Sequence, residues 1–128
     1  MMRIFIILAA ALMIAACTPA AASEPLPTGD AERGAQLFNQ SVNGAPACST
    51  CHTLDGTALV GPSLQGAADA AARVAGQSAE DYLYTSIMQP AAFVVSGYSN
   101  SMYNQYVQYL SPQDTADFIA FLLTLQGD

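Results

Sequence analysis

Two cysteines followed directly by a histidine stand out in this sequence: Cys48-Ser49-Thr50-Cys51-His52. Two thiols at this spacing can form thioethers with the two vinyl groups at one edge of a haem. The next residue then falls beneath the macrocycle, where its imidazole can bind iron. His52 is the only histidine in the chain, so no other imidazole can supply that ligand. The spacing therefore predicts one covalently bound haem c, attached through Cys48 and Cys51 and ligated by His52.

Three other uses of these residues have to be weighed. A redox-active cysteine pair of the thioredoxin type would need alternating strands and helices, and the sequence shows no such alternation. A four-ligand zinc site needs more cysteine or histidine than remains once Cys17 is assigned elsewhere. A disulfide between Cys48 and Cys51 would leave His52 without a role.

The start of the chain differs from the rest. Arg3 is followed by an uncharged apolar run from Ile4 to Ala16, which is shorter than the ~20 residues of a membrane-spanning helix. A basic residue, a short apolar run and small residues at its end indicate a secretory signal over residues 1–16. A buried core helix is the other interpretation, but such a helix would show a polar face.

The end of this run, Ile14-Ala15-Ala16-Cys17, resembles the lipobox of bacterial lipoproteins. That resemblance implies cleavage before Cys17 and lipid attachment to it, and several acyl chains anchor a protein more firmly than one. Cleavage near Ala20–Ala22 would instead release a soluble protein. We expect an exported protein, in the periplasm or at the cell surface, that is lipid-anchored to the membrane.

The rest of the chain divides into an Ala/Pro-rich tether, residues 17–28, and one domain, residues 29–128. After removal of residues 1–16, two basic side chains, Arg33 and Arg73, face ten acidic ones, a net side-chain charge of −8. Such a surface is a poor partner for nucleic acid or an anionic membrane surface. It suits a redox protein with a basic docking face, although solubility alone would explain the same charge.

Helical signals recur along the domain and no strong strand pattern appears, so the sequence predicts an all-α fold. Segment 91–103 is expected to be a loop. The last helix should bury Phe118, Phe121, Leu122 and Leu125 and end at Gly127. The first expected helix starts at Asp30, an N-cap, and has Gly34 and Phe38 on one face. A short alanine-rich helix is expected within Ala67–Ala75, and the next helix starts at Ser78, with Asp81 in its first turn, and ends by Pro90. The last helix starts at Ser111, its N-cap, with Pro112 at the first helical position.

From Thr28 to Leu125 the domain resembles the class I cytochrome c family. Gly29 to Phe38 is similar to the family's amino-terminal helix, with Gly34 and Phe38 in its Gly-x-x-x-Phe contact. Phe121-Leu122 is similar to the aromatic–aliphatic pair of the carboxy-terminal helix. The resemblance implies that these two helices cross, with the glycine allowing close approach, and that four to five helices surround one haem.

The segment Gly61-Pro62-Ser63-Leu64-Gln65-Gly66 resembles the family's Gly-Pro-x-Leu-x-Gly loop. In the family, the proline carbonyl of this loop accepts a hydrogen bond from the axial histidine. The resemblance therefore implies that the Pro62 carbonyl orients the His52 ring, a contact that fixes the tautomer and raises ligand basicity.

The second iron ligand should be one of the methionines outside the signal, Met88 and Met102. Met88 shares a helical face with Tyr84, where a methionine is more often core filler. The family takes its methionine from the loop before the last helix, which implies Met102. Tyr103 follows it, where the family usually has proline.

Histidine–methionine ligation raises the iron potential and leaves no position for a substrate on iron. The sequence therefore predicts an electron carrier, not an enzyme, that takes no small-molecule substrate. It would pass one electron at a time between redox proteins, as a membrane-tethered shuttle or as a subunit of a respiratory or photosynthetic complex. The alternative is a ligand-binding or peroxidatic haem protein, in which Met102 does not bind or leaves easily. A third interpretation is a protein that holds haem passively.

Overall fold

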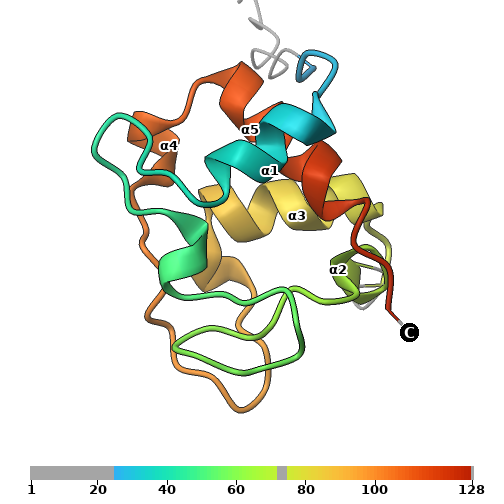
Figure 1. Ribbon diagram of the computed structural model, residues 1–128. Coiled ribbons are helices and arrows are strands. Elements are labelled where there is room, and N and C mark those ends of the chain that lie inside the picture. The colour runs from blue at the N-terminus through green and yellow to red at the C-terminus, as the bar shows by residue number, and fades with distance from the viewer. Residues whose placement is uncertain (1–24, 72–74, 128) are drawn as a thin grey trace, which may run out of the picture.

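The computed structural model describes residues 25–71 and 75–127, and these form a helical domain (Figure 1). The predicted signal, Cys17, the alternative cleavage region and Arg73 lie outside the described residues. Among the described residues, no helix is long and apolar enough to cross a membrane. The described α-helices are α1 (Ala31–Leu37), α2 (Ala67–Ala70), α3 (Ala79–Met88), α4 (Tyr106–Tyr109) and α5 (Pro112–Leu122), with short 3₁₀ helices η1 (Cys48–Thr50) and η3 (Pro90–Ala92).

Strand-type pairing in the described part of the chain is confined to one bridge, between Val42 and Ala45. The predicted all-α fold is therefore confirmed. The helix starts are also where the local signals put them. Asp30 accepts the backbone N–H groups of Glu32 and Arg33 at the start of α1, and Ser78 accepts that of Asp81 in α3.

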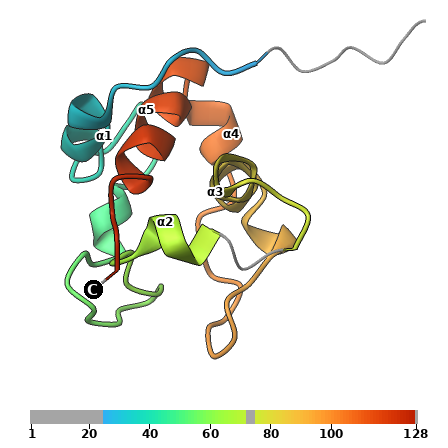
Figure 2. The same ribbon diagram turned by 90° about the vertical axis from the view of Figure 1, so that its right-hand side faces the viewer.

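Helices α1 and α5 lie against each other in both views of the molecule (Figures 1 and 2). Gly34 lies at the crossing, where a Cβ atom would stand 2.0 Å from the Asp117 carbonyl oxygen. No side chain fits in that space, so the glycine is what allows the close approach. The Phe38 and Phe121 rings pack 5.8 Å apart beside it. The expected crossing is thus confirmed.

Helix α5 begins as predicted but ends early. The Ser111 and Asp114 side chains form a capping box at its start. The predicted end at Gly127 is wrong, because α5 stops at Leu122. Beyond it, the Leu125 carbonyl accepts the Ala68 N–H at 3.1 Å, and the Asp69 carboxylate accepts the Gly127 N–H at 2.7 Å. These bonds to α2 take the place of further helical turns.

Two other segments differ from expectation. The alanine-rich stretch is helical only over Ala67–Ala70, with Ala71 as its C-cap, and residues 72–74 are not described. The predicted loop 91–103 includes most of η3, and α4 follows where no helix was expected. The core is formed by α2, α3 and α5, and its buried cluster consists of Ala67, Ala71, Tyr82, Leu83, Ile119 and Leu122.

An ion-pair cluster ties α1 to α5. The Arg33 guanidinium pairs with the carboxylates of Asp114 and Asp117. Asp117 Oδ1 also accepts the Asp30 backbone N–H at 2.7 Å and the Gln113 amide at 2.8 Å. Burial alone would raise the pKa of Asp117, but these donors and the Arg33 charge outweigh it and lower the pKa. The folded state therefore favours the ionised carboxylate.

Asp117→Asn should destabilise the folded protein by about 1–3 kcal/mol at neutral pH, because an amide has one accepting oxygen and no charge and cannot keep the pairing with Arg33 as well as the bonds from Asp30 and Gln113. A carboxyl with a lowered folded-state pKa contributes stability above its unfolded pKa of about 4 and loses it as pH falls through the folded value. The difference between the denaturant midpoints of variant and wild type should therefore stay constant from pH 7 to about pH 4 and shrink as the pH falls further. A difference that does not shrink below about pH 4 would contradict this role.

Candidate functional site

The two cysteines and the histidine lie on and directly after η1: Cys48 begins it, Cys51 is its C-cap and His52 follows. Backbone bonds to the Cys48 carbonyl from Cys51 (3.1 Å) and His52 (3.0 Å) turn the chain tightly enough to bring the three side chains together. The Ser49 N–H bonds the Phe38 carbonyl at 3.0 Å, so the turn is held against the end of α1. Within residues 25–71 and 75–127, neither Cys48 nor Cys51 forms a disulfide. Burial raises the pKa of the Cys48 thiol to about 11.

The His52 ring is oriented by the loop that follows it. Its Nδ1 lies 2.8 Å from the Pro62 carbonyl oxygen, the contact that the family resemblance implied. The Gly61 N–H bonds the Cys51 carbonyl at 2.9 Å, and a Cβ on Gly61 would stand 2.4 Å from the His52 ring. Glycine at this position therefore lets the loop close against the imidazole. With Nδ1 used by Pro62, Nε2 is the nitrogen left to bind a metal.

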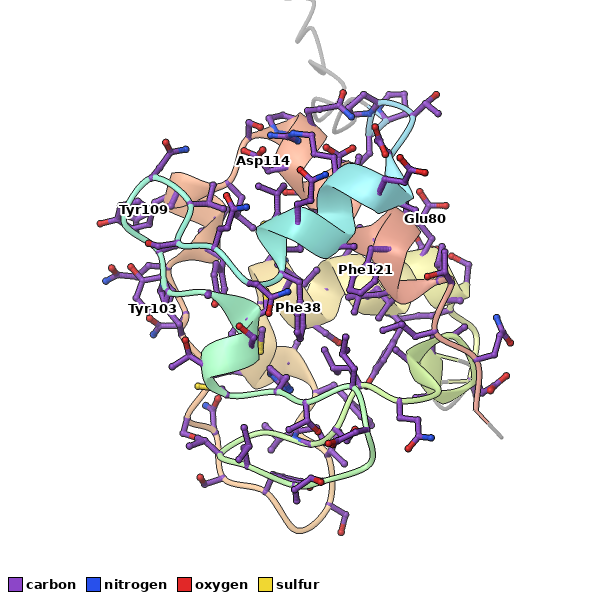
Figure 3. All side chains as sticks on the ribbon, in the orientation of Figure 1. Phe38, Glu80, Tyr103, Tyr109, Asp114 and Phe121 are labelled. Carbon is purple, nitrogen blue, oxygen red and sulfur yellow. The ribbon has the colours of Figure 1, made fainter. Side chains whose placement is uncertain are left out.

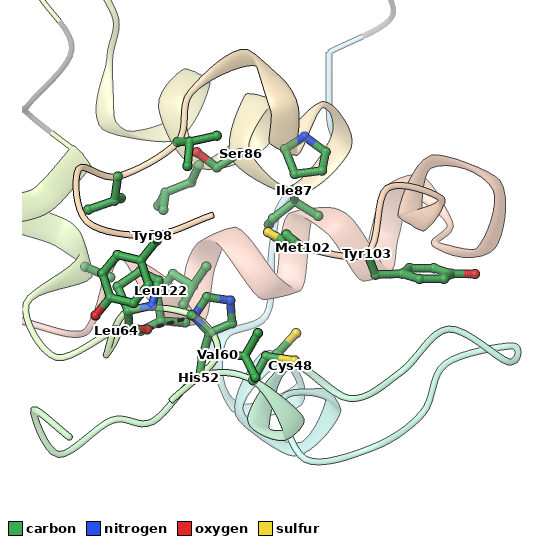
Figure 4. Close-up of a pocket in the computed structure, with 18 of the residues that line it drawn as sticks. Cys48, His52, Val60, Leu64, Ser86, Ile87, Tyr98, Met102, Tyr103 and Leu122 are labelled. Atoms are coloured by element: carbon green, nitrogen blue, oxygen red, sulfur yellow. Dashed lines mark hydrogen bonds between the residues drawn. The ribbon is translucent and has the colours of Figure 1, made fainter. Parts of the chain in front are cut away.

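A cavity opens above this ring, and its walls are mostly apolar. It is lined by all three attachment residues, by apolar side chains of α3 and α5, and by segment 93–103. Figure 4 shows His52 and Cys48 on the attachment side of the cavity, with Met102 on the segment across from them. The fold thus brings the side chains of His52 and Met102 into one cavity.

Met88 occupies a different place. Its side chain is buried, with 8% exposure, and it lines a separate groove with Pro25–Pro27, Tyr84 and Thr115. It is not among the residues that line the cavity above His52. Of the two methionine candidates, only Met102 shares a cavity with His52.

Tyr103 packs where the family usually has proline. Its ring meets that of Tyr106 edge to face, with centroids 5.1 Å apart. The buried Tyr106 hydroxyl donates to the Pro46 carbonyl at 2.9 Å, and Asn43 donates to the Tyr109 carbonyl at 2.9 Å. Helix α4 therefore connects Tyr103, the neighbour of Met102, to residues 43–46, the loop that leads into the attachment cysteines (here called the attachment loop). Sequence reasoning missed this role, although the spacing of the three tyrosines was a visible signal.

Ser86 on α3 is a second residue that the sequence did not single out. Its hydroxyl oxygen is buried and, among described residues, has no hydrogen-bond partner. Ser86 lines the same cavity as Met102 and His52 (Figure 4). Serine hydroxyls in helices usually bond a carbonyl one turn back, and a buried hydroxyl without a partner is costly. Its hydroxyl is thus available to a group bound in the cavity.

Haem c fits this set of residues. Two adjacent thiols lie at one edge of the cavity, an oriented imidazole lies beneath it, and a thioether lies across from the imidazole. Apolar walls suit the porphyrin faces, and Ser86 can donate to a polar group of the cofactor. Haem iron accepts both a thioether and an imidazole as axial ligands.

Comparison with known proteins agrees with the fit. The sequence model of the family described as Cytochrome c matches residues 31–126, from the start of α1 to Gln126 in the segment after α5. No curated protein matches the chain significantly. Covalently attached haem c is the cofactor of that family, and Cys48, Cys51 and His52 lie within the matched range. The chain therefore belongs to the cytochrome c family.

Proposed function

We propose that this protein carries single electrons between redox proteins outside the cytoplasm, with His52 and Met102 as the two axial ligands of its haem iron. Haem-based electron transfer is the general activity of the family. The observation that carries the proposal is the single cavity lined by His52, Met102 and both cysteines. With both axial positions filled, a substrate has no place on iron, which argues for an electron carrier and not an enzyme.

Each residue of the site has a part in this function. Cys48 and Cys51 hold the haem covalently, so that it stays bound in both oxidation states. The Pro62 carbonyl fixes the His52 ring through the 2.8 Å contact and raises its basicity. The bound haem supplies a one-electron ferrous–ferric couple. The apolar walls keep water from the cofactor and, together with the Met102 thioether, favour the ferrous state.

A peroxidatic or ligand-binding function would require Met102 to leave iron easily. The contacts of its neighbour argue against that. Tyr103 is packed against Tyr106, whose hydroxyl is tied to Pro46 in the attachment loop. These contacts restrain the segment that holds Met102, as a proline would. Passive holding of haem would leave no reason for a second ligand in the cavity.

Ligand titration separates these functions. The ferrous protein should not bind carbon monoxide at millimolar concentration, while protein-film voltammetry should show one reversible one-electron wave. Ready carbon monoxide binding by the unmodified protein would favour the ligand-binding function. Absence of a reversible wave would favour passive haem storage.

We further propose that residues 1–16 are removed and that lipid on Cys17 tethers the domain to a membrane, as a shuttle or as a subunit of a respiratory or photosynthetic complex. Residues 18–28 span at most about 35–40 Å when extended, so a lipid at Cys17 would keep the haem near the membrane. The acidic balance of the chain favours a redox partner that carries a basic surface.

Cys17→Ala should move the protein from the membrane fraction to the soluble fraction, because the variant has no thiol to receive lipid. The test is fractionation of cells that express either form, with mass spectrometry of the mature amino terminus to confirm signal removal. Cys17→Ser serves as a second variant of nearly the same size. A cleaved variant that remains in membranes would contradict the lipid anchor.

A further inference from the structure

The segment that holds Met102 has few backbone contacts of its own. Among the residues that the structure describes, the N–H groups of residues 102–105 make no backbone–backbone hydrogen bond. Tyr103 follows Met102, where a proline would restrict the backbone of the residue before it. The place of the Met102 thioether in the cavity therefore depends on the side chains that pack on this segment.

Tyr103 makes such packing contacts. Its ring meets the Tyr106 ring edge to face, with centroids 5.1 Å apart, and lies 6.2 Å from the Tyr109 ring. Figure 3 shows Tyr103 and Tyr109 on the same side of the molecule. Tyr103 and Tyr106 both line the cavity that Met102 lines. Because Tyr103 is bonded directly to Met102, a displacement of the Met102 backbone would disturb these ring contacts.

Tyr106 is in turn fixed to the attachment loop. It is 6% exposed, and its hydroxyl donates to the Pro46 carbonyl at 2.9 Å. Pro46 lies two residues before Cys48 and also lines the cavity. Burial raises the pKa of Tyr106, so the hydroxyl keeps the proton that it donates. A bond at 2.9 Å from the Asn43 side chain to the Tyr109 carbonyl joins the same two segments.

We propose that Tyr106 is a positioning residue for the second axial ligand. Its hydroxyl bond to Pro46 fixes the Tyr106 ring, this ring holds Tyr103, and Tyr103 keeps Met102 in the cavity with His52. The inference rests on the proposed ligation by Met102 and adds which residue controls how often that ligand leaves iron. Tyr106 acts through Tyr103 and not on iron itself.

The consequence is an equilibrium between a closed state, with Met102 on iron, and an open state, with Met102 off iron. An external ligand binds only the open state, so its apparent affinity rises in proportion to the open fraction. Removing one hydrogen bond that is made only in the closed state raises this fraction by about threefold to tenfold. Removing a bond that both states keep leaves the fraction unchanged.

Imidazole binding by the ferric, haem-loaded protein measures the open fraction. Imidazole takes the place of the thioether: the iron–sulfur bond breaks, an iron–nitrogen bond forms, and the iron stays ferric. Tyr106→Phe keeps the ring against Tyr103 and removes only the hydroxyl. It should raise the apparent imidazole affinity by about threefold to tenfold. An affinity equal to that of the unmodified protein would overturn the inference.

Thr115→Val is the matched control, because it also removes one buried hydroxyl–carbonyl bond. Thr115 is 2% exposed, and its hydroxyl donates to the Ser111 carbonyl at 3.0 Å. Thr115 lines the separate groove and not the cavity. Both variants should lower the denaturant midpoint, but only Tyr106→Phe should change imidazole affinity. An equal rise in imidazole affinity in both variants would indicate a general loss of stability and would overturn the proposal.

A double variant tests whether Tyr106 acts through Tyr103. In a Tyr103→Ala background the Tyr103 ring is gone, so the Tyr106 hydroxyl has lost its connection to Met102. Adding Tyr106→Phe to that background should change imidazole affinity by less than about twofold. A rise as large as in the unmodified background would show that the two tyrosines act independently and would overturn the proposed connection.

Failure of this inference and failure of the proposed function give different results. If Met102 is not an iron ligand, the unmodified ferric protein should lack a sulfur-to-iron charge-transfer band, and both proposals are then wrong. If that band is present and Tyr106→Phe binds imidazole no more tightly than the unmodified protein, the ligation stands and the positioning role of Tyr106 is wrong.

Discussion

Met102→Ala should lower the midpoint potential of the haem-loaded protein by on the order of 0.1 V, within the range of about 0.8 V over which axial ligands set haem potentials. The reason is that the thioether stabilises ferrous iron, and water or another harder ligand would replace it. The variant should also bind carbon monoxide, because one axial position is then open. Potentiometric titration and carbon monoxide binding of the purified variant measure both effects.

Met88→Ala is the matched control for this prediction. Met88 is buried against the tether and α5 and does not line the cavity. Its replacement should therefore lower the free energy of unfolding by about 2–5 kcal/mol, as for a buried methionine. The midpoint potential should not change, and the variant should not bind carbon monoxide. If Met88→Ala opened the iron and Met102→Ala did not, the second ligand would be Met88.

Gly34→Ala should destabilise the folded protein by about 2–4 kcal/mol. Alanine is intrinsically better than glycine in a helix by about 1 kcal/mol, so the helix alone would gain stability. The new Cβ would, however, stand 2.0 Å from the Asp117 carbonyl oxygen and 2.8 Å from the Phe121 Cβ. Backbone must therefore move, and α1 and α5 separate at the point where they cross.

The measurement is denaturant unfolding of the haem-loaded variant, followed by far-ultraviolet circular dichroism. Gln36→Ala, at an exposed position of the same helix, is the control, and it should change the free energy of unfolding by no more than about 0.5 kcal/mol. A Gly34→Ala protein as stable as the wild type would show that the crossing does not need glycine.

Features that depend on neighbouring residues could be predicted from the sequence. Asp30 and Ser111 cap their helices with bonds that span two or three residues. The attachment turn is closed by bonds between Cys48, Cys51 and His52. These contacts need no knowledge of the rest of the fold. The Pro62 contact and the Gly34 crossing were predictable only through the family resemblance.

Features set by distant contacts were not predictable. The end of α5 depends on the bond between Gly127 and Asp69, which are 58 residues apart. The role of α4 depends on the bond between Tyr106 and Pro46, 60 residues apart. The Ser86 hydroxyl faces the cavity only because α3 packs with that side inward. A helical pattern shows which face is apolar, but it does not show which cavity a single hydroxyl will meet.

The near-infrared absorption of the oxidised, haem-loaded protein tests the central proposal most directly. If His52 and Met102 are the axial ligands, a sulfur-to-iron charge-transfer band should be present in the unmodified protein. Met102→Ala should remove it, and Met88→Ala should leave it in place. An unmodified protein that carries haem on Cys48 and Cys51 but shows no such band would contradict the proposed ligation. It would also contradict the proposal that both axial positions are filled, on which the electron-carrier function rests.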